Sequence, residues 1–264
     1  MAVLGFIGMG NMGYAILEGA KDSFGKEEII FHRKSEEKMK KLSDEEGIKS
    51  MESNKAVVSN AKYIIMAVKP QMFDKIISEI NEVMDDDKVI ISLAPGFTIE
   101  QLKEKFSAGR IVRSMPNTPA MVGEGMTGVC YDAEEFSRDE IETIEKIFSS
   151  FGKMKIVEEK LMNAVVCASG SSPAYVFMFM EALADSVVKC GLPRQEAYTF
   201  VAQTVLGSAK LMLETGKHPG ELKDMVCSPG GTTIAGVGAL EKNGFRKSLF
   251  EATEACFNKC NNIK

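Results

Sequence analysis

The sequence of 264 residues predicts an α/β fold with a mainly parallel sheet, followed by an all-helical region. In the first part, short apolar segments alternate with segments of helical period, and strands that are apolar throughout are typical of a parallel sheet covered on both faces. A glycine-rich turn directly after the first apolar segment indicates a Rossmann-type sheet. Beyond this part no further strand is indicated, so we expect domains at residues 1–157 and 158–264.

The expected strands are short apolar runs that end at turn residues. We place them at residues 3–7, 29–32, 63–68, 89–93, 110–115 and 153–157, with one or two more within 123–132. Ser35, Thr98 and Ser137 are typical helix N-caps. Gln101 would complete a capping box with Thr98, and Gly47 would end the helix that begins after Ser35.

The second part is predicted to contain four helices, at residues 162–190, 194–215, 232–242 and 245–262. In the first of them residues 176–180 are all apolar, so that helix needs cover on every side. About a hundred residues of helix do not easily provide that cover, and interdigitation with a second copy would. The 17 methionines fit such an adaptable interface, although they fit an ordinary core equally well.

Composition favours a cytoplasmic protein that binds neither nucleic acid nor membrane. The net charge of −5 argues weakly against anionic partners. The N-terminus lacks the features of a signal peptide, and no window of 18 apolar residues lacks a charge. Six cysteines without a CxxC pair and two histidines suggest no metal site. Cys256 and Cys260 share a helix face, which we interpret as core packing.

Gly8, Gly10 and Gly13 form a GxGxxG motif between the first strand and a helix. Gly8 permits the tight turn, Gly10 lets the backbone approach a pyrophosphate, and Gly13 lets the helix pack closely on the sheet. The alternative is a tight turn that binds nothing. The position of the motif between a strand and a helix favours a dinucleotide-binding site.

The end of the second strand favours NADP over NAD. An Asp or Glu for the ribose is expected about 20 residues after the glycines in NAD-binding sheets. Arg33 and Lys34 occupy that place here, and no acid follows before Glu36. Two cations suit a 2′-phosphate because a guanidinium donates several hydrogen bonds to phosphate oxygens. The alternative is a solvated basic tip.

Two further segments have the composition of ligand sites. Residues 114–119, which read SMPNTP, follow an expected strand, where Asn117 and Thr118 could bond a nicotinamide or a substrate. Two prolines there could equally serve a rigid crossing. Residues 228–233 read SPGGTT before a new helix, and offer N–H groups and hydroxyls to a small anion. An ordinary capped turn is the alternative.

With these motifs in order, the chain resembles the pyrroline-5-carboxylate reductase family over nearly its whole length. The resemblance rests on short segments spread along the sequence: residues 5–13, 67–70, 114–119, 169–175, 218–233 and 244–246. It implies reduction of the cyclic imine 1-pyrroline-5-carboxylate to L-proline, the final step of proline biosynthesis. It also implies a homodimer, or a ring of dimers, formed through the helical domain.

The resemblance implies NAD(P)H as cofactor, and Arg33 and Lys34 favour NADPH, with NADH possible but weaker. It assigns the cofactor to residues at the carboxyl ends of the strands: Ile7, Gly8, Met9, Gly10, Asn11, Met12, Arg33, Lys34, Asn54, Ala67, Val68, Lys69, Pro70 and Ala94. It assigns the substrate to the late turn: Ser228, Gly230, Gly231, Thr232 and Thr233. The substrate carboxylate would meet N–H groups of residues 231–233. Thr233 would be the catalytic residue, with its Oγ near the ring nitrogen.

One departure and two rival functions accompany this resemblance. Some members place a Glu two residues before the His-Pro pair, where this chain has Gly216. A β-hydroxyacid dehydrogenase has a similar glycine motif, but uses a lysine base on the first long helix of its second domain. Residues 168–188 of that helix contain no lysine. A protein that senses NADPH without catalysis would bind the cofactor and reduce no imine.

Overall fold

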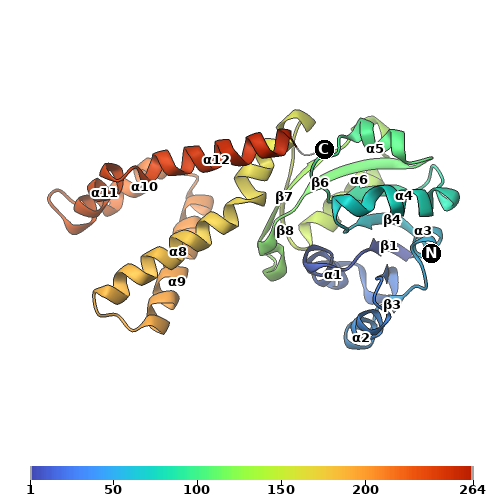
Figure 1. Ribbon diagram of the computed structural model, residues 1–264, viewed down its shortest axis with the longest axis horizontal. Helices are drawn as coiled ribbons and strands as arrows, with labels where there is room; N and C mark the ends of the chain where they lie inside the picture. The colour runs from blue at the N-terminus through green and yellow to red at the C-terminus, as the bar shows by residue number, and fades with distance from the viewer. Residues whose placement is uncertain (1, 263–264) are drawn as a thin grey trace. The chain divides into compact units, whose positions relative to one another are not determined.

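The computed structural model describes residues 2–262 and divides into two compact units (Figure 1). The first unit comprises the chain up to Ser171 together with the residues from Phe257 onward. The second unit is Ser172–Cys256. The division between the two units, after Ser171, lies further along the chain than the domain boundary expected at residue 157. The reason is that the segment after the last strand packs on the sheet. Met162 there is fully buried beside Met115 and Cys130.

The first unit is built on one sheet, which has eight strands within residues 2–262 and the order β3-β2-β1-β4-β5-β6-β7-β8. The strands are β1 Ala2–Ile7, β2 Ile29–His32, β3 Lys49–Ser50, β4 Ala61–Met66, β5 Val89–Ser92, β6 Arg110–Met115, β7 Gly125–Cys130 and β8 Gly152–Ile156. Six of the seven pairings are parallel, and β6 with β7 is antiparallel. The predicted mainly parallel sheet is confirmed.

Six α-helices of the first unit accompany these strands: α1 Asn11–Phe24, α2 Glu36–Glu46, α3 Asn54–Asn60, α4 Phe73–Ile80, α5 Ile99–Lys105 and α6 Arg138–Ser149. The predicted N-caps are confirmed at Ser35, Thr98 and Ser137, and Thr98 forms its capping box with Gln101. The short elements β3 and α3 were not predicted, because neither is long enough to display a periodic pattern. Residues 123–132 hold one strand, β7.

Both faces of the sheet are buried, as apolar strands require. Along β1, Leu4 and Phe6 belong to one core cluster, whereas Ile7 belongs to the other. The first cluster includes residues of α1 and α6, and the second includes residues of α3, α4 and α5. The sheet is therefore packed between two apolar layers, which fix the positions of its strand ends.

A buried ion cluster ties α6 to the sheet. Glu140 accepts hydrogen bonds of 2.6 and 2.7 Å from the two terminal nitrogens of Arg110. Lys62 Nζ lies 2.8 Å from the same carboxylate. The Arg110 guanidinium, with Lys62 and the Ser137 backbone, holds the pKa of Glu140 far below its usual range. The carboxylate is thus ionised and partnered despite its burial.

The chain enters the second unit through a long helical segment. It passes from α7, Met162–Val165, through a π-helical turn at Val166–Gly170, to α8 at Ser172–Lys189. The helices that follow are α9 Arg194–Thr215, α10 Pro219–Val226, α11 Thr232–Lys242 and α12 Phe245–Asn261. The segment expected as one helix over 162–190 contains that π-turn, and the short α10 was not predicted.

The helices α8 and α9 share a small core formed by Ala184, Ala197 and Val201. Most large apolar side chains of the second unit face outward, for example Phe177 at 63% exposure and Leu213 at 81%. By length and composition alone, the helical segment 159–189 would suffice to cross a membrane, and 11% of its most apolar window is buried in this chain. The expected apolar surface is present and remains uncovered within the described chain.

Candidate active site

The glycine motif forms the turn that its sequence predicts. Gly8 has φ +86°, and its N–H donates to the carbonyl of His32 at 3.1 Å. A Cβ on Gly8 would lie 2.4 Å from Val68 Cγ1, and a Cβ on Gly13 would lie 2.8 Å from the Gly8 carbonyl oxygen. Gly10 is the N-cap of α1 and has open space around its Cα. The first N–H groups of α1 are therefore available to an anion.

A cavity of about 390 Å³ opens beside this turn. Six predicted cofactor residues line it: Ile7, Gly8, Arg33, Lys34, Asn54 and Val68. Seven residues that were not predicted complete the lining: His32, Glu52, Ser53, Met72, Lys75, Ile76 and Glu79. The lining comes from four separate strand ends and from α4, so the fold brings together residues that lie more than 70 positions apart in the sequence.

The other predicted cofactor residues lie outside this lining. Met9, Gly10, Asn11 and Met12 form the turn and the first turn of α1. The Ala67 N–H donates to the Ile7 carbonyl at 2.9 Å, which joins the ends of β4 and β1. Lys69 and Pro70 begin a 3₁₀ turn before α4, and the buried Ala94 follows β5.

The charges of the cavity differ from those expected. Glu52 and Glu79 add two carboxylates to a wall in which the sequence had indicated no acid near Arg33. One of these carboxylates accepts a hydrogen bond from Asn54, whose Nδ2 donates to Glu79 Oε2 at 3.1 Å. Lys75 adds a third cation. Lys75 and Glu79 could have been predicted from the sequence. They lie one helical turn apart on the helix that follows the strand-end residues 67–70, so both would be expected on one face of it.

Polar side chains at the end of β6 and in the loop after it form hydrogen bonds to neighbouring backbone segments. Asn117 is buried, its Nδ2 donates to the Ser169 carbonyl at 3.0 Å, and its Oδ1 accepts from the Met126 N–H at 2.9 Å. Ser114 Oγ donates to the Ser92 carbonyl at 3.0 Å. For Asn117 the geometry therefore favours the rigid crossing over a bond to a ligand. Thr118 is exposed.

The late turn of the second unit has the geometry of a helix entrance. Gly230 has φ +68°, and the Gly231 N–H donates to the Ser228 carbonyl at 3.0 Å. Gly231 is the N-cap of α11 and provides no side chain, so the N–H groups of Thr232 and Thr233 have no capping partner from that residue. A Cβ on Gly231 would lie 2.4 Å from Ser228 Oγ. Glycine thus keeps this turn narrow and leaves its N–H groups exposed.

The residue that departs from the family pattern ends α9. Gly216 has φ +62°, and its N–H donates to the Met212 carbonyl at 3.0 Å. A Cβ there would meet nothing within 4 Å, but the left-handed backbone favours glycine. The C-cap of α9 in this chain is therefore a position that a Glu would occupy only with backbone strain.

Comparison with known proteins covers both units. Residues 159–263 match the family model described as pyrroline-5-carboxylate reductase dimerisation, and residues 3–96 match the model described as NADP oxidoreductase, coenzyme F420-dependent. The pyrroline-5-carboxylate reductase of Escherichia coli strain K12 is 47% identical over 259 residues, which span 97% of this chain and 96% of that protein. The chain belongs to the pyrroline-5-carboxylate reductase family.

Solved reductases of this family have the same fold. The Plasmodium falciparum pyrroline carboxylate reductase with NADP bound matches with a TM-score of 0.87 at 33% identity, covering 98% of this chain and 97% of that one. The pyrroline-5-carboxylate reductase of Coxiella burnetii matches with a TM-score of 0.90 at 31% identity, with the same coverage. The resemblance stated from the sequence is thereby confirmed, together with the α/β and helical parts of the fold.

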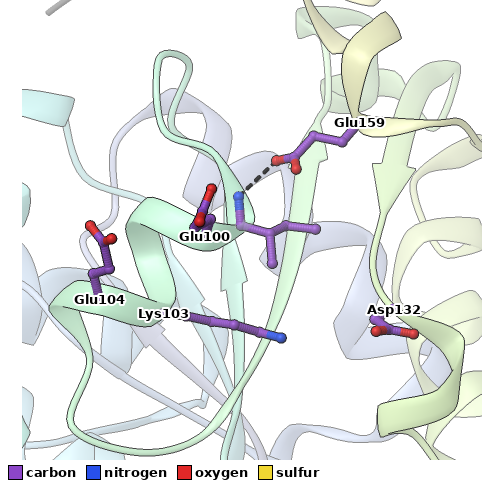
Figure 2. A pocket seen from close by; sticks show the side chains of 6 residues that line it. Glu100, Lys103, Glu104, Asp132 and Glu159 are labelled. Atoms are coloured by element: carbon purple, nitrogen blue, oxygen red, sulfur yellow. Dashed lines mark hydrogen bonds between the residues drawn. The ribbon is translucent and has the colours of Figure 1, made fainter.

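A second cavity of this reductase has a volume of about 610 Å³ (Figure 2). Its lining is mostly acidic: Ile99, Glu100, Lys103, Glu104, Asp132 and Glu159. Glu159 Oε1 accepts from the Ile99 N–H at 2.7 Å and from Arg113 at 2.9 Å, so this carboxylate fastens α5 to β6. None of the predicted cofactor residues lines it, and its carboxylates would repel a dinucleotide. The smaller cavity is the candidate cofactor site.

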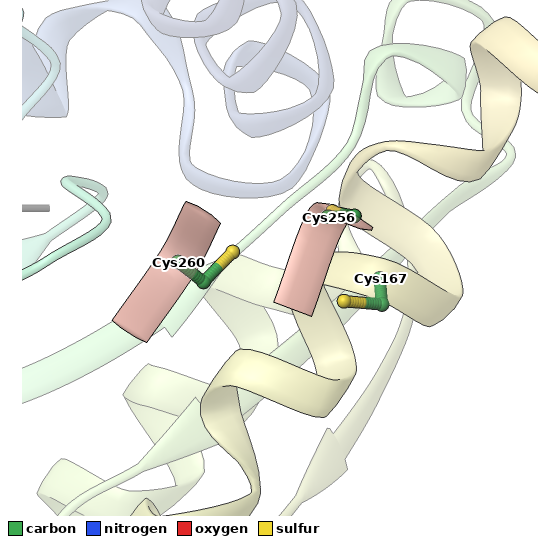
Figure 3. A group of neighbouring side chains, drawn as sticks. All are labelled: Cys167, Cys256 and Cys260. Atoms are coloured by element: carbon green, nitrogen blue, oxygen red, sulfur yellow. The ribbon is translucent and has the colours of Figure 1, made fainter. Parts of the chain in front are cut away.

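A third cysteine, Cys167, lies near Cys260, one of the two cysteines that share a face of α12. Figure 3 shows Cys256 and Cys260 on α12, one turn apart, and Cys167 on the π-helical turn. Within the first unit, the Sγ atoms of Cys167 and Cys260 lie within 4.8 Å of each other.

Proposed function

We propose that this protein reduces 1-pyrroline-5-carboxylate to L-proline, with NADPH as the hydride donor, in the cytoplasm. The proposal rests on one observation: the likeness to pyrroline-5-carboxylate reductases extends over nearly the whole chain, glycine turn and late turn included. Residues 1–157 are proposed as the dinucleotide-binding domain. Residues 158–264 are proposed as the helical domain that dimerises and binds the substrate.

The cofactor residues proposed are those named from the sequence. When bound, NADPH supplies a hydride for the imine carbon. The pyrophosphate is proposed on the N–H groups of residues 7–12, where the glycine turn leads into α1. Arg33 and Lys34 are proposed to bind the 2′-phosphate, and neither forms an ion pair within the described residues 2–262. The nicotinamide end is proposed near residues 67–70 and Ala94.

The substrate is proposed on the turn from Ser228 to Thr233. Its carboxylate would accept from the exposed N–H groups at the start of α11, where the helix adds roughly half a positive charge. Thr233 Oγ would bond the ring nitrogen. A protonated cyclic imine is already an electrophile, so the chain's residues need to orient it and require no general base.

A homodimer, or a ring of dimers, is proposed through the second unit. The support is the outward-facing apolar side chains of α8 and α9, and the family match to a dimerisation region over residues 159–263. An assembly that buries this surface would make the unfolding midpoint depend on protein concentration. A stable, active monomer at nanomolar concentration in sedimentation would refute it.

The test of the function is a spectrophotometric assay of purified protein with pyrroline-5-carboxylate and NADPH. Thr233→Ala should lower kcat/KM for the imine about 10–100-fold, the effect of one or two hydrogen bonds, with NADPH affinity nearly unchanged. Thr232→Ala is the matched control and should cost less. Full activity in Thr233→Ala, or an equal loss of NADPH affinity, would place the substrate elsewhere. Absence of turnover with any imine would refute the function.

A further inference from the structure

The candidate cofactor cavity has an apolar side and a cationic side. Val68, Met72 and Ile76 provide apolar surface from the end of β4 and from α4. Arg33 and Lys34 provide cations from the end of β2. A purine ring prefers the first surface and a phosphate the second, so the chemistry of the lining suits the adenosine end of a dinucleotide.

Lys75 lies on the polar side of the amphipathic helix α4 and adds a cation to this cavity. It is exposed, and in the described residues 2–262 its Nζ takes part in none of the ion pairs. Its neighbour one turn along, Glu79, also lines the cavity. That carboxylate accepts instead from Asn54, and a Lys placed before a Glu at this spacing is the weaker orientation for a helical pair.

The position of Lys75 indicates which phosphate of the cofactor it would contact: the 2′-phosphate and not the pyrophosphate. The pyrophosphate is expected at the N-terminus of α1, where the glycine turn provides N–H groups. Lys75 instead shares its cavity with the residues that follow β2, where the ribose 2′ position is expected. Arg33, Lys34 and Lys75 contribute three cations to the lining, none of which joins an ion pair within residues 2–262, whereas Glu52 and Glu79 contribute two carboxylates.

We propose that Lys75 is a specificity-determining residue that binds the 2′-phosphate of NADP(H) from α4, together with Arg33 and Lys34 from the end of β2. The inference rests on the proposed function, since it assumes that NADPH occupies this cavity. It adds a contact from a helix that the dinucleotide motif does not include. Selectivity for the phosphorylated cofactor then depends on both sides of the adenosine site.

The experiment measures binding of adenosine fragments, without imine or nicotinamide. Isothermal titration of the full-length protein with 2′,5′-ADP and with 5′-AMP reports the 2′-phosphate contact alone. Lys75→Ala should weaken 2′,5′-ADP about 10-fold, as expected for one charge-assisted bond, and change 5′-AMP less than about twofold. Lys75→Arg should restore most of the loss. Lys40→Ala, an exposed lysine on α2 outside the cavity lining, is the matched control and should change neither.

The outcomes separate this inference from the proposed function. Unchanged 2′,5′-ADP binding in Lys75→Ala, or an equal loss for both fragments, would overturn the role of Lys75. Lys75→Glu provides a second variant, which should lose more 2′,5′-ADP affinity than Lys75→Ala while its melting temperature stays near that of the parent. If the parent protein prefers 2′,5′-ADP through Lys75 but reduces no imine, Lys75 keeps its role and the proposed function fails.

Discussion

The two units of this reductase differ in how much of their apolar surface one chain can bury. In the first unit Phe6, Phe31 and Ile64 are fully buried, because the sheet receives helices on both faces. In the second unit Phe177 and Leu213 are mostly exposed although each lies on a long helix. A parallel sheet covered by helices on both faces completes its core within one chain, whereas this helical unit lacks a layer that would cover it.

The largest effect is expected at the exposed apolar face of α8. Phe177→Asp would place a carboxylate in the proposed dimer interface, and an unpartnered buried charge costs about 3–5 kcal/mol. Sedimentation velocity should show the dimer dissociating at micromolar concentration. Glu181→Gln, on the same helix, is the control and should remain dimeric. If Phe177→Asp remained dimeric, the surface of α8 around Phe177 would not be covered by a second copy of the chain.

The next largest effect is expected in the ion cluster of the first unit. Glu140→Gln would remove the partner of Arg110 and Lys62, and should lower the free energy of unfolding by about 2–4 kcal/mol near neutral pH. The pKa of Glu140 is lowered by folding, so its contribution is present above the ordinary carboxyl pKa of about 4.3 and is lost as pH falls below it.

Urea titration at several pH values checks this sign. The difference between the parent protein and Glu140→Gln should be largest at pH 6–7 and should shrink as the pH falls toward about 3. Glu142→Gln, which removes the partner of an exposed arginine on the same helix, provides the control with little effect. A difference that does not depend on pH would contradict the assigned ionisation.

Two glycine substitutions compare the packing of the units directly. Gly19→Ala in α1 would place a Cβ 2.5 Å from the Ser150 carbonyl oxygen, and should cost about 1–3 kcal/mol. Gly236→Ala in α11 meets nothing within 4 Å and should instead stabilise that helix by about 0.5–1 kcal/mol. Thermal unfolding of both variants measures the contrast. A loss for Gly236→Ala would show that another surface packs against that glycine.

The smallest effect is expected for an exposed ion pair of the second unit. Lys217 Nζ lies 2.6 Å from Glu221, with both side chains in solvent. Lys217→Ala should change the unfolding free energy by about 0.3 kcal/mol, and added salt should remove the difference. A loss of more than about 1 kcal/mol would mean that the pair is desolvated in the assembled protein.

The sequence predicted well what depends on neighbours along the chain. The strands of the sheet, the caps at Ser35, Thr98 and Ser137, and the bounds of α9 and α11 follow from periodicity and capping chemistry. The glycine turn was predicted for the same reason, since steric demands within a few residues select glycine. The two-residue strand β3 and the seven-residue helix α3 were not predicted.

The sequence by itself determined the family, the order of the longer strands and helices, and the residues of the glycine turn, because each of these features depends on a contiguous segment. The tertiary structure alone decided which residues share the candidate cofactor cavity with Arg33. It brought in Glu52 from the end of β3 and Lys75 and Glu79 from α4, and Asn117 is hydrogen-bonded to Ser169 and Met126. The physical reason is that parallel strands, linked by helices, bring distant residues to a common edge, and local sequence does not state which side chains meet there.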